Sequence, residues 1–159
     1  MPDFHLELLR LSDARMVFEW RNKPEIVRLS SSQKIVLWEE HEAWIKNSIN
    51  NPGRQVYIMY SGNTAVGQVR FERIEASKNA AISVYLLHEY TGIGLGVAGI
   101  KLGVQTIFSL WNDLLEIYAF VREDNIPSQK AFHKSGFKPA ENNRNEVEDH
   151  VLYTIKNER

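Results

Sequence analysis

The fold of this chain is decided by the stretch Thr91-Gly92-Ile93-Gly94-Leu95-Gly96. It follows an apolar run at residues 81–87, which predicts a strand. A second apolar run, at residues 95–110, begins within the stretch and predicts a helix. Glycines at alternate positions let backbone N–H groups approach an anion closely, with the positive end of a helix dipole behind them. The stretch therefore predicts a loop that binds phosphate or pyrophosphate, and packing alone is the alternative explanation of its glycines.

The composition is that of one ordinary globular domain. The chain has 159 residues, 43% hydrophobic and 25% charged, which is enough for one core. A formal net charge of −1 argues against a nucleic-acid partner, and the lack of cysteine excludes disulfides, thiolate metal sites and a cysteine nucleophile. No apolar run reaches membrane-spanning length and no leader-like segment opens the chain, so we expect a cytoplasmic protein with no membrane partner and no metal.

Hydrophobic periodicity around the loop predicts a mixture of strands and helices. Strands are expected at residues 4–10, 55–60, 64–73, 80–87 and 114–121, and helices up to residue 21 and over 37–49, 95–110 and 125–135. Ser12 and Asp13 are candidate caps of the first helix, Pro24 interrupts it, and Gly136 closes the last helix. Two strand-like pieces flank a polar stretch at 141–146. The order predicts an α+β domain with one mixed sheet and helices packed on it.

A second motif follows the loop and one intervening strand. It reads Asn125-Ile126-Pro127-Ser128-Gln129-Lys130-Ala131-Phe132-His133-Lys134-Ser135-Gly136-Phe137. In this order the two motifs resemble the GNAT superfamily of acetyl-coenzyme A-dependent N-acetyltransferases, whose loop reads Arg/Gln-x-x-Gly-x-Gly/Ala and whose later signature reads Asn-x-x-Ala/Ser, an aromatic residue and Gly-Phe. The resemblance covers residues 4–156 and implies one domain over 1–159, with a twisted, mostly antiparallel sheet of about seven strands in which a parallel pair splays apart.

The resemblance implies acetyl-coenzyme A as the co-substrate. Its pyrophosphate would lie on the loop amides, and its pantetheine arm would lie between the strands predicted at 80–87 and 114–121 and form strand-like hydrogen bonds. Main-chain groups near Tyr85 would hold this arm, and the Asn125 side chain would contact it. The residues implied in cofactor binding are Leu86, Leu87, Thr91, Gly92, Ile93, Gly94, Leu95, Gly96, Asn125, Ser128 and Phe132.

Three positions depart from the family pattern. Thr91 stands where Arg or Gln is usual in the loop. Ala81 replaces a Glu that many members use as a base or to hold a water, and Phe132 replaces a Tyr that many use to protonate the coenzyme A thiolate. A neutral amine held against the thioester can still attack it, with positioning and carbonyl polarisation by a strand N–H supplying the acceleration.

The N-terminal third is expected to bind the acceptor amine. It carries Trp20-Arg21-Asn22 and then His41-x-x-Trp44, which resembles the GNAT branch that acetylates nucleotide-linked 4-amino-4,6-dideoxy sugars of the pseudaminic acid type. That branch also has a Ser/Thr-Lys pair and a tyrosine facing the substrate. With a small length difference, these fall on Ser77, Lys78 and Tyr85.

The resemblance implies a role for each polar side chain of this set. Arg21 and Lys78 would pair with the diphosphate, and His41 would act as the base. Tyr85 would hydrogen-bond the thioester, the coenzyme A sulfur or the sugar. Packing is the alternative throughout: tryptophans at these positions favour a core role, and the arginine and histidine also suit a helix end and a half-buried helix face.

Two other functions remain open on the sequence. Relatives with similar N-terminal helices acetylate protein N-termini or aminoglycosides, and an acidic cleft formed by Glu39, Glu40 and Glu42 would favour such a cationic drug. Loss of the usual acid and base at positions 132 and 81 instead allows an acetyl-coenzyme A-binding module with little turnover. We expect a small-molecule amine as the substrate, and a homodimer is also open.

Overall fold

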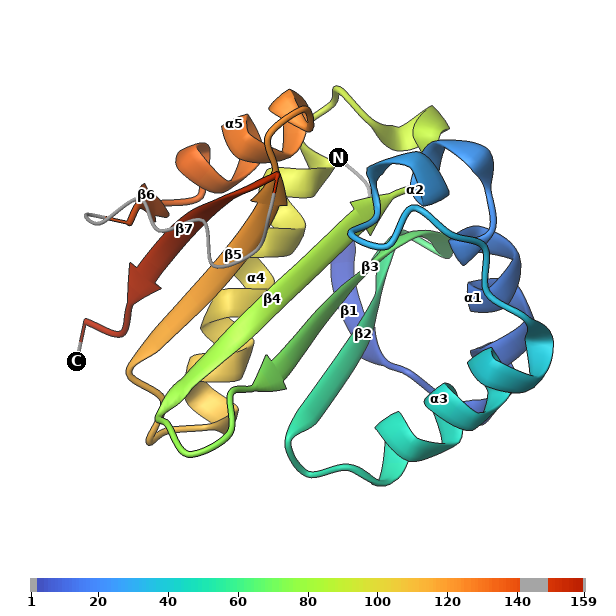
Figure 1. Cartoon of the computed structure of the whole chain (residues 1–159), viewed down its shortest axis with the longest axis horizontal. Coiled ribbons are helices and arrows are strands. Elements are labelled where there is room, and N and C mark those ends of the chain that lie inside the picture. The colour runs from blue at the N-terminus through green and yellow to red at the C-terminus, as the bar shows by residue number, and fades with distance from the viewer. Residues whose placement is uncertain (1–2, 141–148, 159) are drawn as a thin grey trace.

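One mixed sheet forms the centre of the computed structural model, which describes residues 3–140 and 149–158 (Figure 1). The order of its strands is β1-β2-β3-β4-β5-β7-β6. The strands are β1 (Phe4–Leu8), β2 (Arg54–Ser61), β3 (Thr64–Arg73), β4 (Asn79–Leu86), β5 (Glu116–Arg122), β6 (Lys138–Pro139) and β7 (His150–Lys156). The helices are α1 (Ala14–Arg21), α2 (Pro24–Leu29), α3 (Trp38–Asn50), α4 (Leu95–Leu110) and α5 (Ile126–Lys134), with short 3₁₀ turns η1 (Leu11–Asp13) and η2 (His88–Tyr90).

Strands β4 and β5 are the parallel pair, while the other neighbouring strands run antiparallel. The β4–β5 register covers Asn79–Ala81 against Glu116–Tyr118. Beyond these three pairs, the described parts of the two strands separate, although β4 stays paired with β3 and β5 with β7. The predicted fold, with a mostly antiparallel sheet and a splayed parallel pair, is confirmed.

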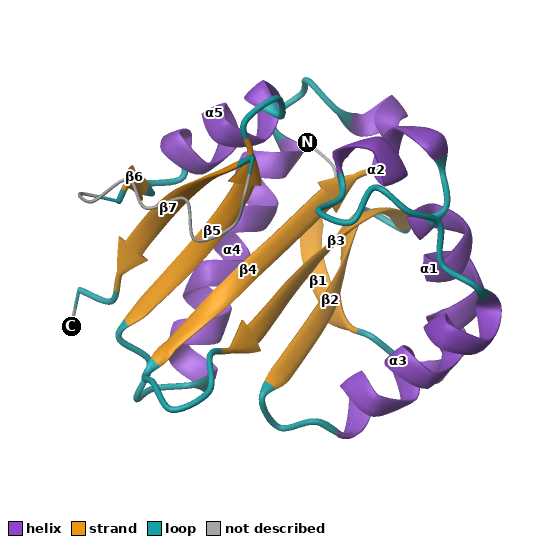
Figure 2. Ribbon diagram, in the orientation of Figure 1, coloured by secondary structure: helices purple, strands orange, loops and turns teal. Residues whose placement is uncertain are grey.

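Hydrophobic side chains pack on both faces of the sheet because strand residues alternate between its faces. On one face, α4 and α5 cover a core that includes Phe71, Ile100 and Phe137. On the other face, α1 and α3 cover a second core that includes Val17 and Ile45. Figure 2 shows α4 behind the sheet and α1–α3 beside β2 and β3, so the two faces carry different helices.

Several predicted boundaries differ from the structure. The first strand ends at Leu8. Asp13 is the N-cap residue of α1, as predicted, but its side chain accepts a hydrogen bond from Arg10 N (2.9 Å) and forms no capping bond to α1. Pro24 interrupts the first helix but also opens the short helix α2, because proline suits the first turn, where the N–H has no intrahelical acceptor. The polar stretch predicted at 141–146 lies outside the described residues.

Close packing between α4 and the sheet depends on small residues. A Cβ at Gly99 would overlap Met59 Sδ, and one at Gly103 would lie 3.1 Å from Phe71 Cζ, so both positions require glycine for close packing. Gly67 has a stricter requirement. Its Cβ would overlap the carbonyl oxygen of Tyr85 and would lie 3.0 Å from Leu86 Cα, in the part of β4 that has left β5.

We expect Gly67→Ala to lower the free energy of unfolding by about 2–3 kcal/mol, because backbone atoms of β4 must move to admit the methyl group. Gly99→Ala is the matched control. Its clash is with a flexible thioether, and alanine favours the helix by about 1 kcal/mol, so its net loss should be smaller. Urea unfolding of both variants measures the difference, and equal losses would contradict this account.

Candidate active site

The glycine loop has the backbone conformation of an anion site. Gly92 and Gly94 have φ values of 78° and 88°, and Gly94 is the N-cap of α4. The first α4 hydrogen bond runs from Ala98 N to Gly94 O (3.1 Å), so the preceding amides of the first turn have no acceptor within the helix. A Cβ at Gly92 or Gly94 would meet nothing within 4 Å, so glycine serves backbone conformation here.

The loop leaves most of its residues accessible. Thr91, Gly92, Ile93 and Gly94 are exposed, whereas Leu95 is buried in the core beside the sheet. Thr91 Oγ1 donates to His88 O (2.7 Å), which fastens the start of the loop to η2. The exposed amides and the helix N-terminus together suit a pyrophosphate.

The residues predicted to bind the rest of the cofactor divide into two kinds. Leu87 N donates to Val66 O (2.9 Å), and the Leu87 side chain is buried. Only the other main-chain atoms of this segment are therefore available to hydrogen-bond a cofactor. Asn125 Oδ1 accepts from Ser128 N (3.2 Å) and caps α5, which leaves the amide nitrogen for a ligand. Cofactor contact by Asn125 and Ser128 stays a prediction.

Phe132 is a correction to the predicted site. Its side chain is 2% exposed and its ring packs edge-on against Phe137, with centroids 5.0 Å apart. A ring enclosed in the α5 side of the core cannot present a face to a ligand. The aromatic position of the motif therefore holds α5 on the sheet.

Arg21 and His41 carry buried polar atoms that point to a missing ligand. Arg21 Nη2 donates to Ser32 Oγ (3.0 Å), but Arg21 Nη1 and His41 Nε2 are buried with no hydrogen-bond partner among the described residues. Leaving such atoms unpaired costs about 1–3 kcal/mol each, and more for a charged group. The sequence prediction placed both residues in the acceptor site, and the structure brings them together.

Aromatic rings hold His41 in place. Its ring stacks on Trp44, with centroids 5.9 Å apart, and lies 5.6 Å from the ring of Phe18. Burial, and then the nearby charge of Arg21, lower the pKa of His41 below its ordinary value of 6.5. A neutral imidazole at neutral pH can accept a proton.

Tyr85 lies on the same face of the sheet, at the end of β4. Its hydroxyl donates to Gln68 Oε1 (3.4 Å), directly across the β3–β4 register. Burial raises the pKa of Tyr85, so its hydroxyl stays protonated and can donate. Trp20 packs edge-on against this ring at 6.4 Å but is only 6% exposed, so its predicted substrate contact is corrected to a core role.

A row of cations surrounds these residues. The Arg70 guanidinium lies 5.3 Å from the Trp44 ring centroid, and the Arg54 guanidinium lies 5.4 Å from it. Charges on Arg21 and Arg70 act on Tyr85, and the charge on Arg21 acts on His41. The charges that act on His41 and Tyr85 are therefore those of arginines, while Glu72 on the same face is paired with Arg54 (2.9 Å).

The predicted acidic cleft is wrong for this face. Successive helix residues turn by about 100°, so the neighbours of His41 on α3 point elsewhere. Glu39 and Glu40 are exposed, and Glu42 pairs with Lys46 (3.7 Å). The charges that act on the buried histidine and tyrosine come from arginines instead.

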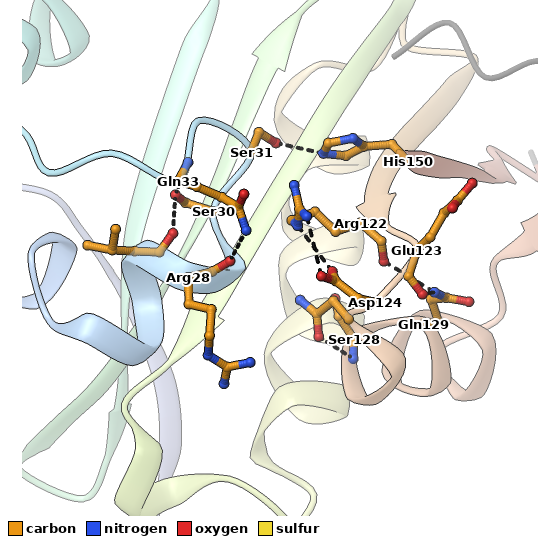
Figure 3. Close-up of polar contacts among 12 residues, drawn as sticks. Arg28, Ser30, Ser31, Gln33, Arg122, Glu123, Asp124, Ser128, Gln129 and His150 are labelled. Atoms are coloured by element: carbon orange, nitrogen blue, oxygen red, sulfur yellow. Dashed lines mark hydrogen bonds and ion pairs between the residues drawn. The ribbon is translucent and has the colours of Figure 1, made fainter. Parts of the chain in front are cut away.

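Asn22 fastens the loop that follows α2. Its Oδ1 accepts from Val36 N and its Nδ2 donates to Val36 O, both at 2.8 Å. These bonds give Asn22 a positioning role, and its predicted contact with substrate stays a prediction. Ser31 Oγ lies 3.1 Å from His150 Nε2, so the same loop also reaches β7 (Figure 3).

Ser77 and Lys78 lie at the wrong end of β4 for the predicted site. Ser77 forms a local turn, with its Oγ donating to Ile74 O (2.8 Å), and Lys78 O accepts from Leu115 N (2.7 Å). At about 3.3 Å per residue, Lys78 lies roughly 20 Å along the strand from Tyr85. The prediction that Arg21 and Lys78 bind one diphosphate is therefore corrected.

The sequence interpretation missed Gln68, Arg70 and His150. The signal for the first two was present in β3, where polar Gln68, Arg70 and Glu72 alternate with Val69 and Phe71. Nothing local identifies His150, because its contact with the loop joins residues far apart in the sequence. Within residues 3–140 and 149–158, no group of His, Asp or Glu side chains suits a metal ion, and no helix is long and apolar enough to cross a membrane.

Comparisons with known proteins agree with this architecture. The family model of the acetyltransferase (GNAT) domain matches residues 3–138. The chain is 24% identical over 130 residues to acetyltransferase PseH of Campylobacter jejuni subsp. jejuni, which covers 81% of this chain and 79% of that protein.

Solved structures with low sequence identity share the fold. A domain from Methanocaldococcus jannaschii has a TM-score of 0.84 and 22% identity, and covers 99% of this chain and 100% of its own. AAC(6')-Ib in complex with ribostamycin and coenzyme A has a TM-score of 0.85 and 16% identity, with coverages of 97% and 93%. Spermidine N-acetyltransferase from Vibrio cholerae, in complex with coenzyme A and spermine, has a TM-score of 0.84 and 17% identity, with coverages of 96% and 95%.

We expect an NMR titration to give His41 a pKa below 6.5. Arg21→Gln should raise this pKa without restoring 6.5, because burial is the larger cause of the shift. Arg15→Gln is the matched control on α1, since the Arg15 guanidinium lies over Trp38 (4.0 Å). An equal change in both variants would contradict a specific effect of Arg21.

The same shift predicts how stability depends on pH. Because the pKa of His41 is lower in the folded state, the unfolded chain binds more protons below pH 6.5. The contribution of neutral His41 is complete above pH 6.5 and is lost as the pH falls from there toward the lower folded pKa. Urea unfolding should therefore show that the free energy of unfolding of wild type, minus that of His41→Gln, decreases as the pH falls through this window. A difference that stays constant with pH would contradict this prediction.

Proposed function

Because the chain belongs to the GNAT acetyltransferase family, we propose that it transfers the acetyl group of acetyl-coenzyme A to the primary amine of a nucleotide-linked amino sugar. One observation carries the choice of an anionic acceptor: among the described residues, the buried Nη1 of Arg21 has no hydrogen-bond partner, and the charge of Arg70 acts from the same face. A diphosphate supplies the acceptor oxygens that such a face lacks. The similarity to acetyltransferase PseH supports the same branch.

The co-substrate fits the residues at the end of β4. The pyrophosphate of acetyl-coenzyme A would lie on the exposed amides from Gly92 to Gly96, at the N-terminus of α4. The arm that carries the thioester would enter between β4 and β5, which separate after Ala81 and Tyr118. Main-chain groups of β4 that do not pair with β5 are then available as hydrogen-bond partners for the arm.

The reaction is a direct transfer between two bound substrates. The sugar ammonium gives a proton to His41 Nε2, either directly or through water, and becomes a neutral amine. The amine nitrogen then attacks the thioester carbon, a C–N bond forms and the C–S bond breaks. The departing coenzyme A thiolate takes the remaining excess proton from the nitrogen, so the products are a neutral amide and the coenzyme A thiol. A strand N–H polarises the carbonyl oxygen, and positioning supplies most of the acceleration.

Tyr85 is suited to the sulfur side of this reaction. Because burial raises the pKa of its hydroxyl, the group remains a hydrogen-bond donor at neutral pH. It lies on β4 just before the segment that leads to the glycine loop. We assign it a hydrogen bond to the thioester or to the departing thiolate, a role that the Tyr of other family members would otherwise fill at position 132.

The charge of the site separates the proposed acceptor from two others. AAC(6')-Ib is bound to ribostamycin and the V. cholerae enzyme is bound to spermine in the similar structures, and both of these ligands are polyamines. A polycationic ligand would meet Arg21 and Arg70 on this face, while the third cation, Arg54, is paired with Glu72. Like charges at such distances oppose binding, which favours an anionic acceptor here.

We expect coenzyme A to be released from acetyl-coenzyme A when a UDP-4-amino-4,6-dideoxy sugar is added, and not when an aminoglycoside or spermidine is added. His41→Ala should lower kcat by roughly 100-fold through loss of the base, and Arg21→Ala should raise the KM for the sugar nucleotide by about tenfold or more. Both variants should still bind acetyl-coenzyme A. Arg15→Ala, on the same helix but over Trp38, is the control that keeps activity.

Three results would change the proposal. Release with the aminoglycoside alone would keep the acetyltransferase and overturn the acceptor. Near-wild-type rates in both variants would overturn the site assignment. Tight binding of acetyl-coenzyme A with no release in any reaction would favour a binding module with little turnover.

A further inference from the structure

Arg70 lies in the middle of β3, on the same face of the sheet as Tyr85. The β3–β4 register places Arg70 opposite Ser83 and Gln68 opposite Tyr85. Arg70 Nη2 donates to Ser83 Oγ (3.3 Å), and the guanidinium lies over the Trp44 ring (5.3 Å). Ser83 is exposed, so a ligand can reach the guanidinium from this side.

Comparable arginines on this sheet carry a carboxylate partner. Arg54 lies over the same Trp44 ring, and its Nε lies 2.9 Å from Glu72 Oε1. Arg73 lies over Trp111 (4.6 Å), and its Nη2 lies 2.8 Å from Asp113 Oδ1. Arg70 has no such partner within ion-pair distance in the described part of the chain, because the neighbouring Glu72 carboxylate is already held by Arg54.

The surroundings of Arg70 make an anion favourable there. Burial lowers the pKa of Arg70, and the cations Arg54 and Arg21 act in the same direction, while the charge of Glu72 opposes them. Burial, Arg54 and Arg21 each disfavour the charged form of the Arg70 guanidinium, and a bound anion would offset this cost. The indole of Trp44 holds the planar guanidinium in position, which lowers the entropy lost on binding.

We propose that Arg70 is the specificity-determining residue that binds the diphosphate of the acceptor, in the role that the sequence assigned to Lys78. The inference rests on the proposed function, because it names the group within that site that selects an anionic amine. A guanidinium can bind two phosphate oxygens at once, with its two N–H groups parallel to them. Together with Arg21, it gives the face two cations for one diphosphate.

Binding of UDP and of inorganic pyrophosphate tests this role without requiring catalysis. Isothermal titration is done with coenzyme A at saturating concentration, so that the glycine loop is occupied and cannot bind the probe. We expect Arg70→Gln to weaken the binding of both probes by roughly 10- to 100-fold, the loss expected for hydrogen bonds to a charged group. Uridine, which lacks phosphate, should bind wild type and variant equally.

Two further variants separate charge from position. Arg73→Gln also removes a cation of β3 that lies over a tryptophan ring, but this cation is paired with Asp113. This variant should therefore bind UDP as wild type does. Arg70→Lys keeps the charge and loses the planar fork, so its affinity should lie between those of wild type and Arg70→Gln. Unchanged binding of coenzyme A to each variant, measured by the same titration, shows that the fold is kept.

The outcomes distinguish this inference from the proposed function. Equal UDP affinity in wild type and Arg70→Gln overturns the role of Arg70, even if a sugar nucleotide is acetylated. The same holds if wild type binds neither UDP nor pyrophosphate, or if Arg73→Gln loses as much affinity as Arg70→Gln. A selective loss in Arg70→Gln supports the anion site, even if the proposed sugar is not acetylated and another anionic amine must be sought.

Discussion

The separation of β4 from β5 is the constraint on which the rest of the structure depends. A sheet that paired these strands along their whole length would leave no main-chain groups for a ligand. Here the pairing stops after Ala81 and Tyr118, while β3 and β7 keep the outer edges of the two strands paired. Gly67 helps to make this possible, since only a residue without Cβ lets β3 lie against the carbonyl of Tyr85. The open segment leads directly to the glycine loop, so one departure from regular pairing places both parts of the proposed cofactor site.

The alternation of strand residues then assigns different tasks to the two faces. Val69 and Phe71 point to the side covered by α4 and complete an apolar core. The intervening residues Gln68 and Arg70 point to the side covered by α1 and α3, where His41 and Arg21 also lie. Unpaired cations on that side would destabilise a domain that had no ligand for them. We interpret these cations as residues that lower the stability of the free domain and that serve to bind a ligand.

How far the sequence predicts the molecule depends on the range of the interactions involved. The limits of β3 and α4 were predicted correctly, because periodicity and glycine act locally, and the order of motifs identified the fold. Side-chain roles were harder. Phe132 and Trp20 matched positions of functional motifs but are enclosed by packing. Ser77 and Lys78 suited the chemistry, yet the turn between β3 and β4 places them far from the acceptor side. The alternation in β3 indicates that Arg70 lies on a polar face, but its place beside Trp44 depends on how α3 packs on the sheet.

The missing acid and base also bear on how protons move in the proposed reaction. Ala81 is the position where many family members have a Glu. In the β3–β4 register, the carboxylate residue Glu72 lies directly opposite it. However, the Glu72 carboxylate is already held by Arg54, whose Nε lies 2.9 Å from Glu72 Oε1. In His41, burial and the charge of Arg21 favour the neutral form, and Nε2 has no hydrogen-bond partner in the described part of the chain. In the proposed reaction, proton removal therefore falls to His41 on α3, and β4 would contribute positioning and the hydrogen bond from Tyr85.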